Sequence, residues 1–209
     1  MKIYPIVEGQ GEVAAVPVLL PRALHDEAQC FDVQVGRPIR RKQYEFHRED
    51  SLGGAVKLAS LQQDCAGILV LFDGEDDCPA TTGERVRAWA RIAAPNVPCE
   101  VVLAYREYES WFLAGLESLR GHFSIAAEAQ APATPESRRN AKGALEEFMG
   151  PGASYSPTIH QAPISATLDL GLVHRRSRSF RKLTKSIGSL LMCIGKSPAT
   201  WPPRHWLAP

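Results

Sequence analysis

Apolar and polar residues alternate along the first part of the chain in blocks of strand length and of helix length. Largely apolar runs, typical of strands buried on both faces of a sheet, lie at residues 2–7, 31–35, 67–72 and 99–105. Between them, apolar residues recur at helical spacing at residues 12–24, 51–63, 81–92 and 106–114. Pro17 indicates that the first helix starts near this residue, since proline is tolerated in a first turn. The alternation predicts an α/β fold, with a mainly parallel sheet of about four strands flanked by helices.

The composition shifts after this alternating part. Residues 121–157 are rich in Ala, Pro, Ser and Gly, with one short helix candidate at residues 141–149. Two apolar stripes of helical spacing follow, one through Ile164 and one through Phe180, and the last residues are too rich in proline for a helix. We therefore predict an α/β core at residues 1–120, a linker or excursion at 121–160, a basic helical C-terminal extension at 161–195 and a flexible tail at 196–209.

Charge and cysteine content leave the function to local features. The 209 residues include 24 Lys and Arg and 23 Asp and Glu, so the chain as a whole is neither basic nor acidic. The five cysteines have no C-x-x-C spacing, which argues against a disulfide framework and a structural zinc site. The chain has no apolar run long enough to span a bilayer and starts with a strand-like segment, so we expect a cytoplasmic protein without a membrane partner.

A group of acidic residues follows the third predicted strand. It contains Asp73, Glu75, Asp76 and Asp77. Each close pair of like charges repels by about 1 kcal/mol even in water, so a positive group is expected nearby. Helix capping would be an ordinary role for such residues, but the next helix has its own capping box in Thr81 and Glu84. Ligands of α/β sheets bind beyond the carboxyl ends of the strands, so we predict that Asp73 binds a metal ion.

Other acidic residues follow the neighbouring strands. Glu8 comes directly after the first strand, and parallel strand ends can bring it into one crevice with Asp73. Carboxylate oxygens with open positions for water and phosphate suit Mg²⁺ or Mn²⁺, which could activate a phosphodiester and a bound water. Glu107 and Glu109, after the fourth strand, could act as further ligands or as a general base. Alternatively, they could form a favourable acidic first turn of the following helix.

The segment from Gly9 to Ala14 offers a rival interpretation. It matches the G-x-G-x-x-A form of the dinucleotide-binding fingerprint, between a predicted strand and a predicted helix. Arg37 or Arg40, after the second strand, could then bind the phosphorylated ribose of NADP in a dehydrogenase. However, Glu8 and Glu12 would face the pyrophosphate at the helix N-terminus, where N–H groups are needed. We therefore rank this interpretation below the metal site.

The C-terminal extension carries basic residues opposite an apolar stripe. They are Arg175, Arg178, Arg181, Lys182 and Lys185. Lysine and arginine on one helix face can neutralise phosphates without reading a base sequence, so this segment is a candidate nucleic-acid-binding element. The solvated outer face of a helix would show the same pattern, and beside an acidic metal crevice we consider the two interpretations equal. Lys142 could add a further cation to the site, on its charge alone.

The order of these residues resembles the Toprim arrangement of topoisomerases, primases and OLD-type nucleases. In that arrangement a glutamate follows the first strand and an Asp-x-Asp motif follows the third, as in Ile6–Gly9 with Glu12 and in Leu71–Asp76. The wider sequence is similar to an uncharacterised bacterial Toprim-like family, through Phe-Asp-x-x-Asp-Asp-Cys-Pro, Arg-Glu-Tyr-Glu-x-Trp-Phe and Ser-x-Ser-Phe-Arg-Lys-Leu. The resemblance implies a Rossmann-like core that ends near Leu116.

The resemblance also implies roles for particular residues. Glu8 matches the catalytic glutamate and Asp73 the first metal-binding aspartate. Glu75 stands where a Toprim protein has its second aspartate; its longer side chain keeps an oxygen ligand, and Asp76 or Asp77 could share the role. Our candidate sets are therefore Glu8, Glu12 and Glu109 as catalytic residues, and Glu8, Asp73, Glu75 and Asp76 as metal ligands.

These features together predict a divalent-metal-dependent nuclease, or a related enzyme that processes phosphodiesters. Its cofactor would be Mg²⁺ or Mn²⁺, and its substrate DNA rather than RNA. The resemblance further implies an ABC-type ATPase partner in phage defence or DNA repair. The alternative is a subunit that binds a metal or a partner without catalysis, because Glu75 replaces an aspartate of the motif.

Overall fold

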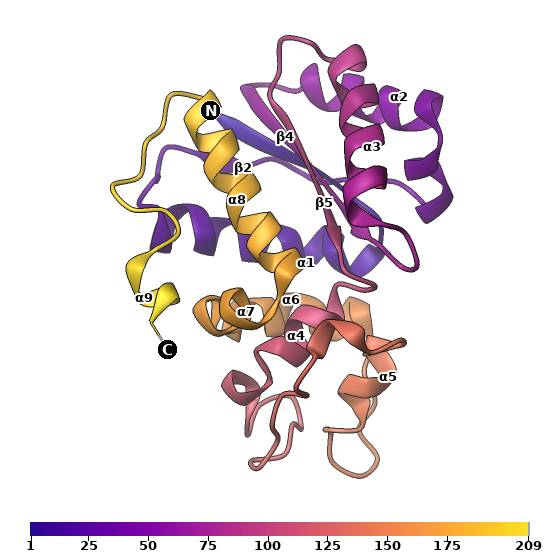
Figure 1. Ribbon diagram of the computed structural model, residues 1–209, viewed down its shortest axis with the longest axis vertical. Helices are drawn as coiled ribbons and strands as arrows, with labels where there is room; N and C mark the ends of the chain where they lie inside the picture. Colours follow the sequence, from indigo (N-terminus) through magenta and orange to yellow (C-terminus); the bar gives the residue numbers. More distant parts are fainter. Residues whose placement is uncertain (209) are drawn as a thin grey trace.

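A parallel β-sheet lies at the centre of the computed structural model, which describes residues 1–208 (Figure 1). Its strands are β1 (Lys2–Val7), β2 (Gln34–Val35), β3 (Ile39–Arg40), β4 (Cys65–Asp73) and β5 (Cys99–Ala104). They pair in the order β2-β1-β4-β5, with β3 also on β1, and all these pairs are parallel. The predicted α/β class is confirmed. The second predicted strand, at residues 31–35, is reduced to the short β2, and β3, which Gly36 and Pro38 separate from it, was not predicted.

Parallel pairing brings the ends of the strands to one edge of the sheet. Val7 of β1 pairs with Leu71 of β4, and Asp73 of β4 pairs with Ala104 of β5. The residues that follow β1, β4 and β5 therefore lie at the same carboxyl edge, where ligands of α/β proteins bind.

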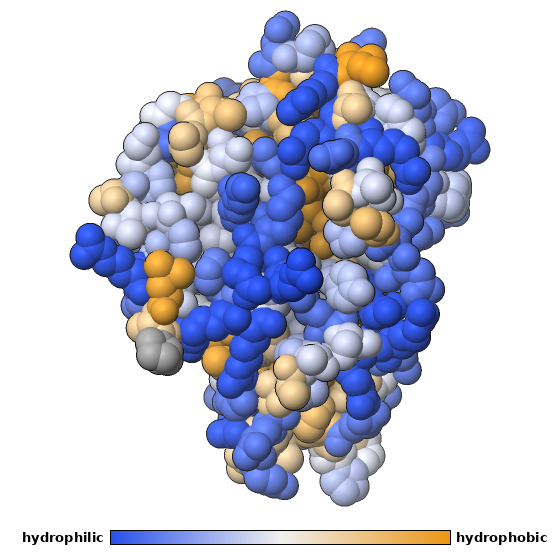
Figure 2. All heavy atoms as spheres, viewed as in Figure 1, coloured by the Kyte–Doolittle hydropathy of each residue, from blue (hydrophilic) through white to orange (hydrophobic). Residues whose placement is uncertain are grey.

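Two layers of helices cover the sheet. The helices α2 (Glu49–Ser60) and α3 (Pro79–Ala93) pack on one face, and α1 (Gln10–Pro21) and α8 (Arg178–Cys193) pack on the other. Side chains of β4 point alternately into the two layers, with Phe72 against α2 and α3 and Leu71 against α1 and α8. Burial on both faces explains the unbroken apolar run of this strand. In Figure 2, hydrophilic residues cover much of the visible face, and apolar residues show in a hollow between α8 and α3.

The first helix begins earlier than predicted. It starts at Gln10, so that Pro17 and Pro21 both lie inside α1, and the prediction of a start near Pro17 was wrong. An interior proline costs about 3 kcal/mol, because it removes a hydrogen bond and crowds the preceding turn. Burial of Val16 and Leu19 offsets this cost, at roughly 1.5–3 kcal/mol for each fully buried side chain. After Pro21 the helix widens into a π-helical segment at Arg22–Glu27.

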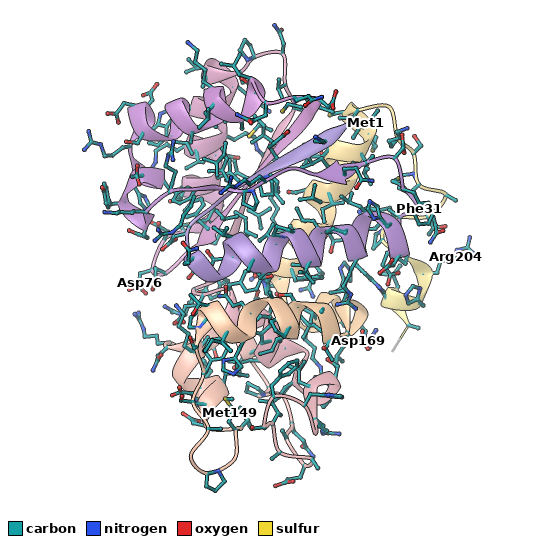
Figure 3. All side chains as sticks on the ribbon, turned by 180° about the vertical axis from the view of Figure 1, so that it is seen from behind. Met1, Phe31, Asp76, Met149, Asp169 and Arg204 are labelled. Atoms are coloured by element: carbon teal, nitrogen blue, oxygen red, sulfur yellow. The ribbon has the colours of Figure 1, made fainter. Side chains whose placement is uncertain are left out.

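The remaining helices form the lower part of the molecule in Figure 1 and the end of the chain. They are α4 (Glu109–Ala114), α5 (Ala141–Glu146), α6 (Pro157–Thr167), α7 (Leu170–Arg176) and α9 (Arg204–Leu207). Short 3₁₀ segments lie at Gln43–His47, Leu116–Leu119 and Pro135–Ser137. Figure 3 shows from behind that α6 lies along α1. Among residues 1–208, no helix combines the length and the apolar composition needed to cross a membrane.

One hydrophobic core joins the four segments into which the sequence analysis divides the chain. It contains Leu19 of the predicted core, Leu145 of the excursion, Leu183 of the extension and Trp206 of the tail. The described part of the tail, predicted to be flexible, is packed: Trp206 is 2% exposed, and Trp201 Nε1 donates to the carbonyl oxygen of Thr184 at 2.8 Å. Pro209, the end of the predicted tail, lies outside the described residues.

Candidate active site

Two acidic side chains meet where β1 and β4 end. Asp73 is the last residue of β4 and is buried, and Glu8 follows β1. The backbone N–H of Asp73 donates to Glu8 Oε2 at 3.3 Å. Asp73 Oδ1 also accepts the backbone N–H of Tyr108 at 2.8 Å, which ties the end of β4 to the start of α4. The structure therefore brings together the two residues on which the predicted site depends.

Two more acidic residues complete a group that we call the carboxylate cluster: Glu8, Glu12, Asp73 and Glu109. Glu12 lies in the first turn of α1, where its Oε2 accepts the backbone N–H of Gly9. Glu109 is fully buried, and its Oε1 accepts hydrogen bonds from Tyr155 Oη at 2.9 Å and Gln161 Nε2 at 2.8 Å. The same Nε2 lies 3.4 Å from Glu12 Oε1. Gln161, from α6, therefore joins the carboxylates of α1 and α4.

Burial and mutual repulsion raise the pKa values of the carboxylate cluster. Burial, followed by the charge of Glu12, raises the pKa of Glu8 from its ordinary value of 4.5 to about 7. Burial and then the charges of Glu12, Glu109 and Glu8 raise the pKa of Asp73 well above its usual range. Burial likewise raises the pKa values of Glu12 and Glu109. Near neutral pH, the positive charge around the cluster is therefore too small to stabilise all four carboxylates in their ionised form.

Lys142 is a basic residue whose charge acts on all four carboxylates of the cluster. Lys142 lies at the start of α5, which Glu107 holds by two hydrogen bonds. Glu107 Oε1 accepts the backbone N–H of Ala141 at 3.0 Å, and Glu107 Oε2 accepts the backbone N–H of Lys142 at 3.4 Å. Glu107 Oε2 also lies 3.6 Å from Lys142 Nζ. Burial opposes the charge of Lys142, yet Glu109 and Asp73 raise the pKa of its amine. Glu107 therefore positions Lys142, whereas Glu109 belongs to the cluster itself.

An unpaired oxygen inside the cluster allows a test of whether the residues fit a metal ion. Among residues 1–208, the side-chain oxygens Glu109 Oε2 and Gln161 Oε1 are buried without a hydrogen-bond partner. Leaving such a group unpaired costs about 1–3 kcal/mol. Carboxylate and amide oxygens are the donors that Mg²⁺ and Mn²⁺ prefer, so the chemistry of the cluster fits these ions.

The geometry of the cluster is less complete than its chemistry. Within the described part of the chain, no three Asp, Glu, His or Cys side chains are already arranged around one ion position. The carboxylates of Glu8 and Glu12 each accept a backbone N–H instead. Each of these carboxylates keeps a second oxygen for an ion, so coordination of one ion by three of them would require the side chains to move closer together.

The other predicted metal ligands lie outside the cluster. Glu75, on the turn after β4, is exposed, although its charge contributes to the raised pKa of Glu8. Asp76 is also exposed, and its Oδ1 lies 2.8 Å from Arg106 Nη1 and 2.9 Å from Arg139 Nη2. Hydrogen bonds from Arg139 and then Arg106 lower the pKa of Asp76. The positive charge expected near the acidic loop is thus supplied in part by arginine side chains.

The glycines of the rival fingerprint make room for the cluster. A Cβ atom at Gly9 would lie 2.7 Å from Glu12 Oε2, and one at Gly11 would lie 2.0 Å from Gln161 Oε1. Glycine therefore allows these two side chains to approach the start of α1. The Glu12 carboxylate already occupies the end of α1 where a pyrophosphate would bind. The geometry disfavours the dehydrogenase interpretation.

The predicted nucleic-acid-binding residues differ in their contacts. Arg181 Nη1 donates to the carbonyl oxygens of His174 and Arg175 at 2.9 Å, which caps the end of α7. Lys182 Nζ lies 3.3 Å from Glu100 Oε2. These two residues therefore stabilise the fold locally. Arg175, Arg178 and Lys185 are exposed, and Arg175 Nη1 donates to the carbonyl oxygen of Trp206 at 3.4 Å.

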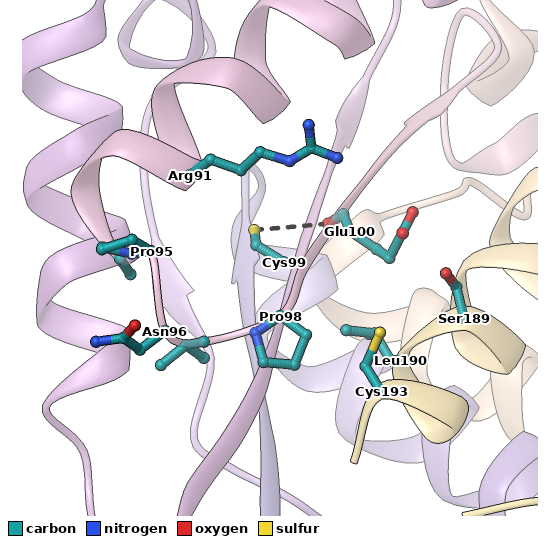
Figure 4. A pocket seen from close by; sticks show the side chains of 11 residues that line it. Arg91, Pro95, Asn96, Pro98, Cys99, Glu100, Ser189, Leu190 and Cys193 are labelled. Carbon is teal, nitrogen blue, oxygen red and sulfur yellow. Dashed lines mark hydrogen bonds between the residues drawn. The ribbon is translucent and has the colours of Figure 1, made fainter. Parts of the chain in front are cut away.

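A separate cavity of about 450 Å³ lies at the opposite end of β5 from Asp73 (Figure 4). Its lining includes Arg91, Cys99 and Cys193. Burial raises the pKa of the Cys99 thiol to about 12, so this thiol is not a nucleophile at neutral pH. We assign no chemistry to this cavity.

Comparison with known proteins gives a family but no activity. A family described as a domain of unknown function (DUF4276) matches residues 7–188. The chain belongs to this family. No curated protein and no solved structure matches the chain. The matched range contains the whole carboxylate cluster together with Lys142 and Gln161, so the site lies within the part of the chain that defines this DUF4276 protein.

Some residues of the site were missed by the sequence analysis. Tyr155 and Gln161, which hold Glu109, come from the predicted excursion and from the helix after it. Neither follows a strand or belongs to a motif, so no sequence signal distinguished them. Lys142 was noted only for its charge, and its hydrogen-bonded helix start is what places it near the cluster.

Proposed function

We propose that this DUF4276 protein is a divalent-metal-dependent nuclease, or a related enzyme that processes phosphodiesters, with the carboxylate cluster as its active site. The observation that carries the proposal is the charge imbalance of the cluster: its four carboxylates have raised pKa values, and one of them, Glu109, has a buried oxygen without a hydrogen-bond partner. A divalent cation would restore the balance.

The residues of the cluster would divide the work. Glu8 and Asp73, at the ends of adjacent strands, would hold Mg²⁺ or Mn²⁺, with Glu12 or Glu109 as a further ligand. The ion would supply positive charge to polarise a phosphodiester and to lower the pKa of a bound water. With a pKa of about 7 in the absence of an ion, Glu8 can also exchange a proton near neutral pH. Lys142, held by Glu107, would stabilise negative charge on the substrate.

Other parts of the proposal rest on the resemblance to Toprim proteins alone. They are the preference for DNA over RNA, the ABC-type ATPase partner and a role in phage defence or DNA repair. Co-purification of an ATPase with the tagged full chain from its own host would support the partner.

A cleavage assay tests the proposed activity. Supercoiled plasmid, single-stranded DNA and RNA are incubated with the purified chain and Mg²⁺, Mn²⁺ or EDTA. Glu8→Gln and Asp73→Asn keep a hydrogen-bond acceptor but remove the charge, so both variants should lose metal-dependent cleavage. Asp50→Asn, an exposed position on α2, removes the same charge elsewhere and should cleave like the wild type. Cleavage that persists in EDTA, or in both cluster variants, would contradict the proposal.

The second candidate is a subunit that binds a metal or a partner without catalysis. It is favoured by Glu75, which stands at the position of the second metal-binding aspartate of the motif but is exposed and lies outside the cluster. Titration with Mn²⁺, followed by electron paramagnetic resonance, distinguishes the two candidates. Binding that Asp73→Asn abolishes, without cleavage of any substrate, would favour the binding subunit over the nuclease.

A further inference from the structure

A groove of about 950 Å³ follows the outer edge of β5, between α3 and α8, and no residue of the carboxylate cluster lines it. Within the described chain, no strand pairs with this edge of the sheet. The hollow visible between α8 and α3 in Figure 2 corresponds to this groove, which we call the β5 groove. Its far end is lined by the segment from Ala133 to Ser137.

The walls of the β5 groove are basic. Five basic residues and two acidic residues line it, although the chain as a whole has a net charge of only +1. The basic residues are Arg87, Arg176, Arg178, Arg181 and Lys182. Arg87 and Lys182 share the carboxylate of Glu100, at 3.2 and 3.3 Å. Arg176 Nη1 pairs with Glu117 Oε2. Among residues 1–208, no ion pair or side-chain hydrogen bond engages the guanidinium of Arg178, whose backbone N–H alone is bonded. Of the basic residues in the lining, Arg178 is therefore the one whose charged group is open to an anion.

The floor of the β5 groove is apolar and aromatic. Val101 and Leu103 of β5 lie beneath it and are only 1% and 3% exposed, so the half-buried ring of Tyr105 is the part of the floor that a base can contact. A floor of this kind between basic walls suits a single strand of nucleic acid, whose bases can contact the floor while its phosphates meet the walls. A duplex keeps its bases stacked inside and presents mainly phosphates, so it would leave the floor uncovered.

One acidic residue of the lining limits where phosphates can bind. Glu136 Oε1 accepts hydrogen bonds from Ser177 Oγ at 2.7 Å and from Ser179 N at 2.8 Å, and its Oε2 accepts one from Arg178 N at 2.8 Å. This carboxylate closes the N-terminus of α8. Phosphates therefore have to bind the side chains of the walls, and Glu136 repels them.

We propose that the β5 groove binds single-stranded nucleic acid, with phosphates on Arg178 and Lys182 and bases on Tyr105. This inference rests on the proposed function, because it assigns the place where the substrate of the nuclease is held. It differs from the basic-helix interpretation of the sequence, since Lys185 does not line the groove and Arg87 of α3 does.

Fluorescence anisotropy of the full chain with a labelled oligothymidylate, about ten nucleotides long, tests the assignment in EDTA. Each phosphate contact contributes about 0.7 to the slope of log affinity against log salt concentration. At about 0.1 M salt, the loss of one such contact therefore lowers the affinity roughly 5-fold. Arg178→Gln and Lys182→Gln should each weaken binding by this factor and reduce the slope by about 0.7. Tyr105→Leu should weaken binding roughly 5-fold or more through lost stacking, without a change of slope.

Two variants guard against a loss of binding caused by misfolding or by net charge alone. Glu136→Gln removes a negative charge from the groove and keeps an acceptor for α8, so it should strengthen binding, which an unfolded protein cannot do. Lys57→Gln removes an exposed positive charge from α2 and should bind like the wild type. Equal affinity of the wild type and the groove variants would overturn the proposal, as would no binding by the wild type. The proposal would also be overturned if a duplex bound with the same affinity as the single strand, or if an acidic peptide displaced the labelled oligonucleotide as effectively as unlabelled oligonucleotide does.

The groove and the proposed catalytic function can fail separately. Glu8→Gln should bind the oligonucleotide in EDTA like the wild type, because the cluster lies outside the groove. If the groove variants weaken binding but no metal ion supports cleavage, the nuclease proposal is contradicted and the proposed role of the groove is kept. Metal-dependent cleavage that the groove variants do not affect would contradict the proposed role of the β5 groove and leave the nuclease proposal intact.

Discussion

The substitution Glu8→Gln should make the protein more stable at alkaline pH while it removes the response to metal ions. Burial and the charge of Glu12 raise the pKa of Glu8 from 4.5 to about 7. The folded protein therefore binds a proton at Glu8 more tightly than the unfolded chain does, and the wild type loses stability as the pH rises from about 4.5 to about 7. Glutamine keeps the acceptor for the Asp73 N–H but carries no charge.

The size of the effect follows from the pKa shift. The rise from 4.5 to about 7 corresponds to about 3.4 kcal/mol, at 1.36 kcal/mol for each unit. Glu8 is only half-buried, so solvent screening reduces this figure to about 1–2 kcal/mol. For a chain of this size, a gain of 1 kcal/mol raises the melting temperature by roughly 2–4 °C. We therefore expect Glu8→Gln to melt roughly 2–8 °C above the wild type at about pH 8 in EDTA.

Differential scanning calorimetry at about pH 8 and about pH 5 measures the effect. At the lower pH the wild-type Glu8 is protonated in the folded protein, so the advantage of the variant should largely disappear. With Mg²⁺ at pH 8, the wild type should gain stability in proportion to occupancy, and the variant should gain little. Glu49→Gln, at an exposed position of α2, serves as the control and should change little under all conditions.

Two results would refute this reasoning. A Glu8→Gln protein less stable than the wild type at pH 8 in EDTA would show that the Glu8 charge is compensated in the folded state. An equal gain at both pH values would show that the gain does not come from the charge of Glu8.

Three further changes probe the surroundings of the cluster and the packed tail. Lys142→Gln should lower the free energy of unfolding by about 1 kcal/mol at pH 8, because the carboxylates lose a compensating charge; addition of salt should shrink the difference. Gly11→Ala should lower the free energy of unfolding in urea by about 1–3 kcal/mol, because the new Cβ would meet Gln161. Gly54→Ala, whose Cβ would meet nothing within 4 Å, should instead stabilise α2 by roughly 0.5–1 kcal/mol. Trp206→Ala should cost about 3–5 kcal/mol and lower the urea midpoint without a change of slope; a wild-type midpoint would show that the tail is not packed in solution.

The sequence predicted those features that depend on local pattern and on strand topology. The apolar runs and helical spacing were enough for the α/β class, because a sheet covered on both faces requires them. The meeting of Glu8 and Asp73 followed from one rule, that parallel strands end at the same edge of the sheet. Both predictions use the order of the residues along the chain and need no side-chain packing.

The features that were missed depend on contacts between segments distant in the sequence. The pairing of Asp76 with Arg139, and the hydrogen bonds from Tyr155 and Gln161 to Glu109, join the strand ends to residues of the predicted excursion and beyond. That region has the composition of a loop, and its place against the sheet is set by tertiary burial that no periodicity reveals. The tail was missed for the same reason: its prolines argue against a long helix, but Trp206 is enough to pack it.

Hydrogen bonding alone does not explain the chemistry of the cluster. Glu12 accepts the N–H of Gly9, Asp73 that of Tyr108 and Glu8 that of Asp73, so each has a structural role. An amide side chain offers the same acceptor without a charge, and asparagine caps a helix as well as aspartate does. Amides at these positions would avoid the repulsion that raises the pKa values of Asp73 and Glu8. Stability therefore disfavours the carboxylates that this chain contains, and their charge is accounted for if the site binds a cation.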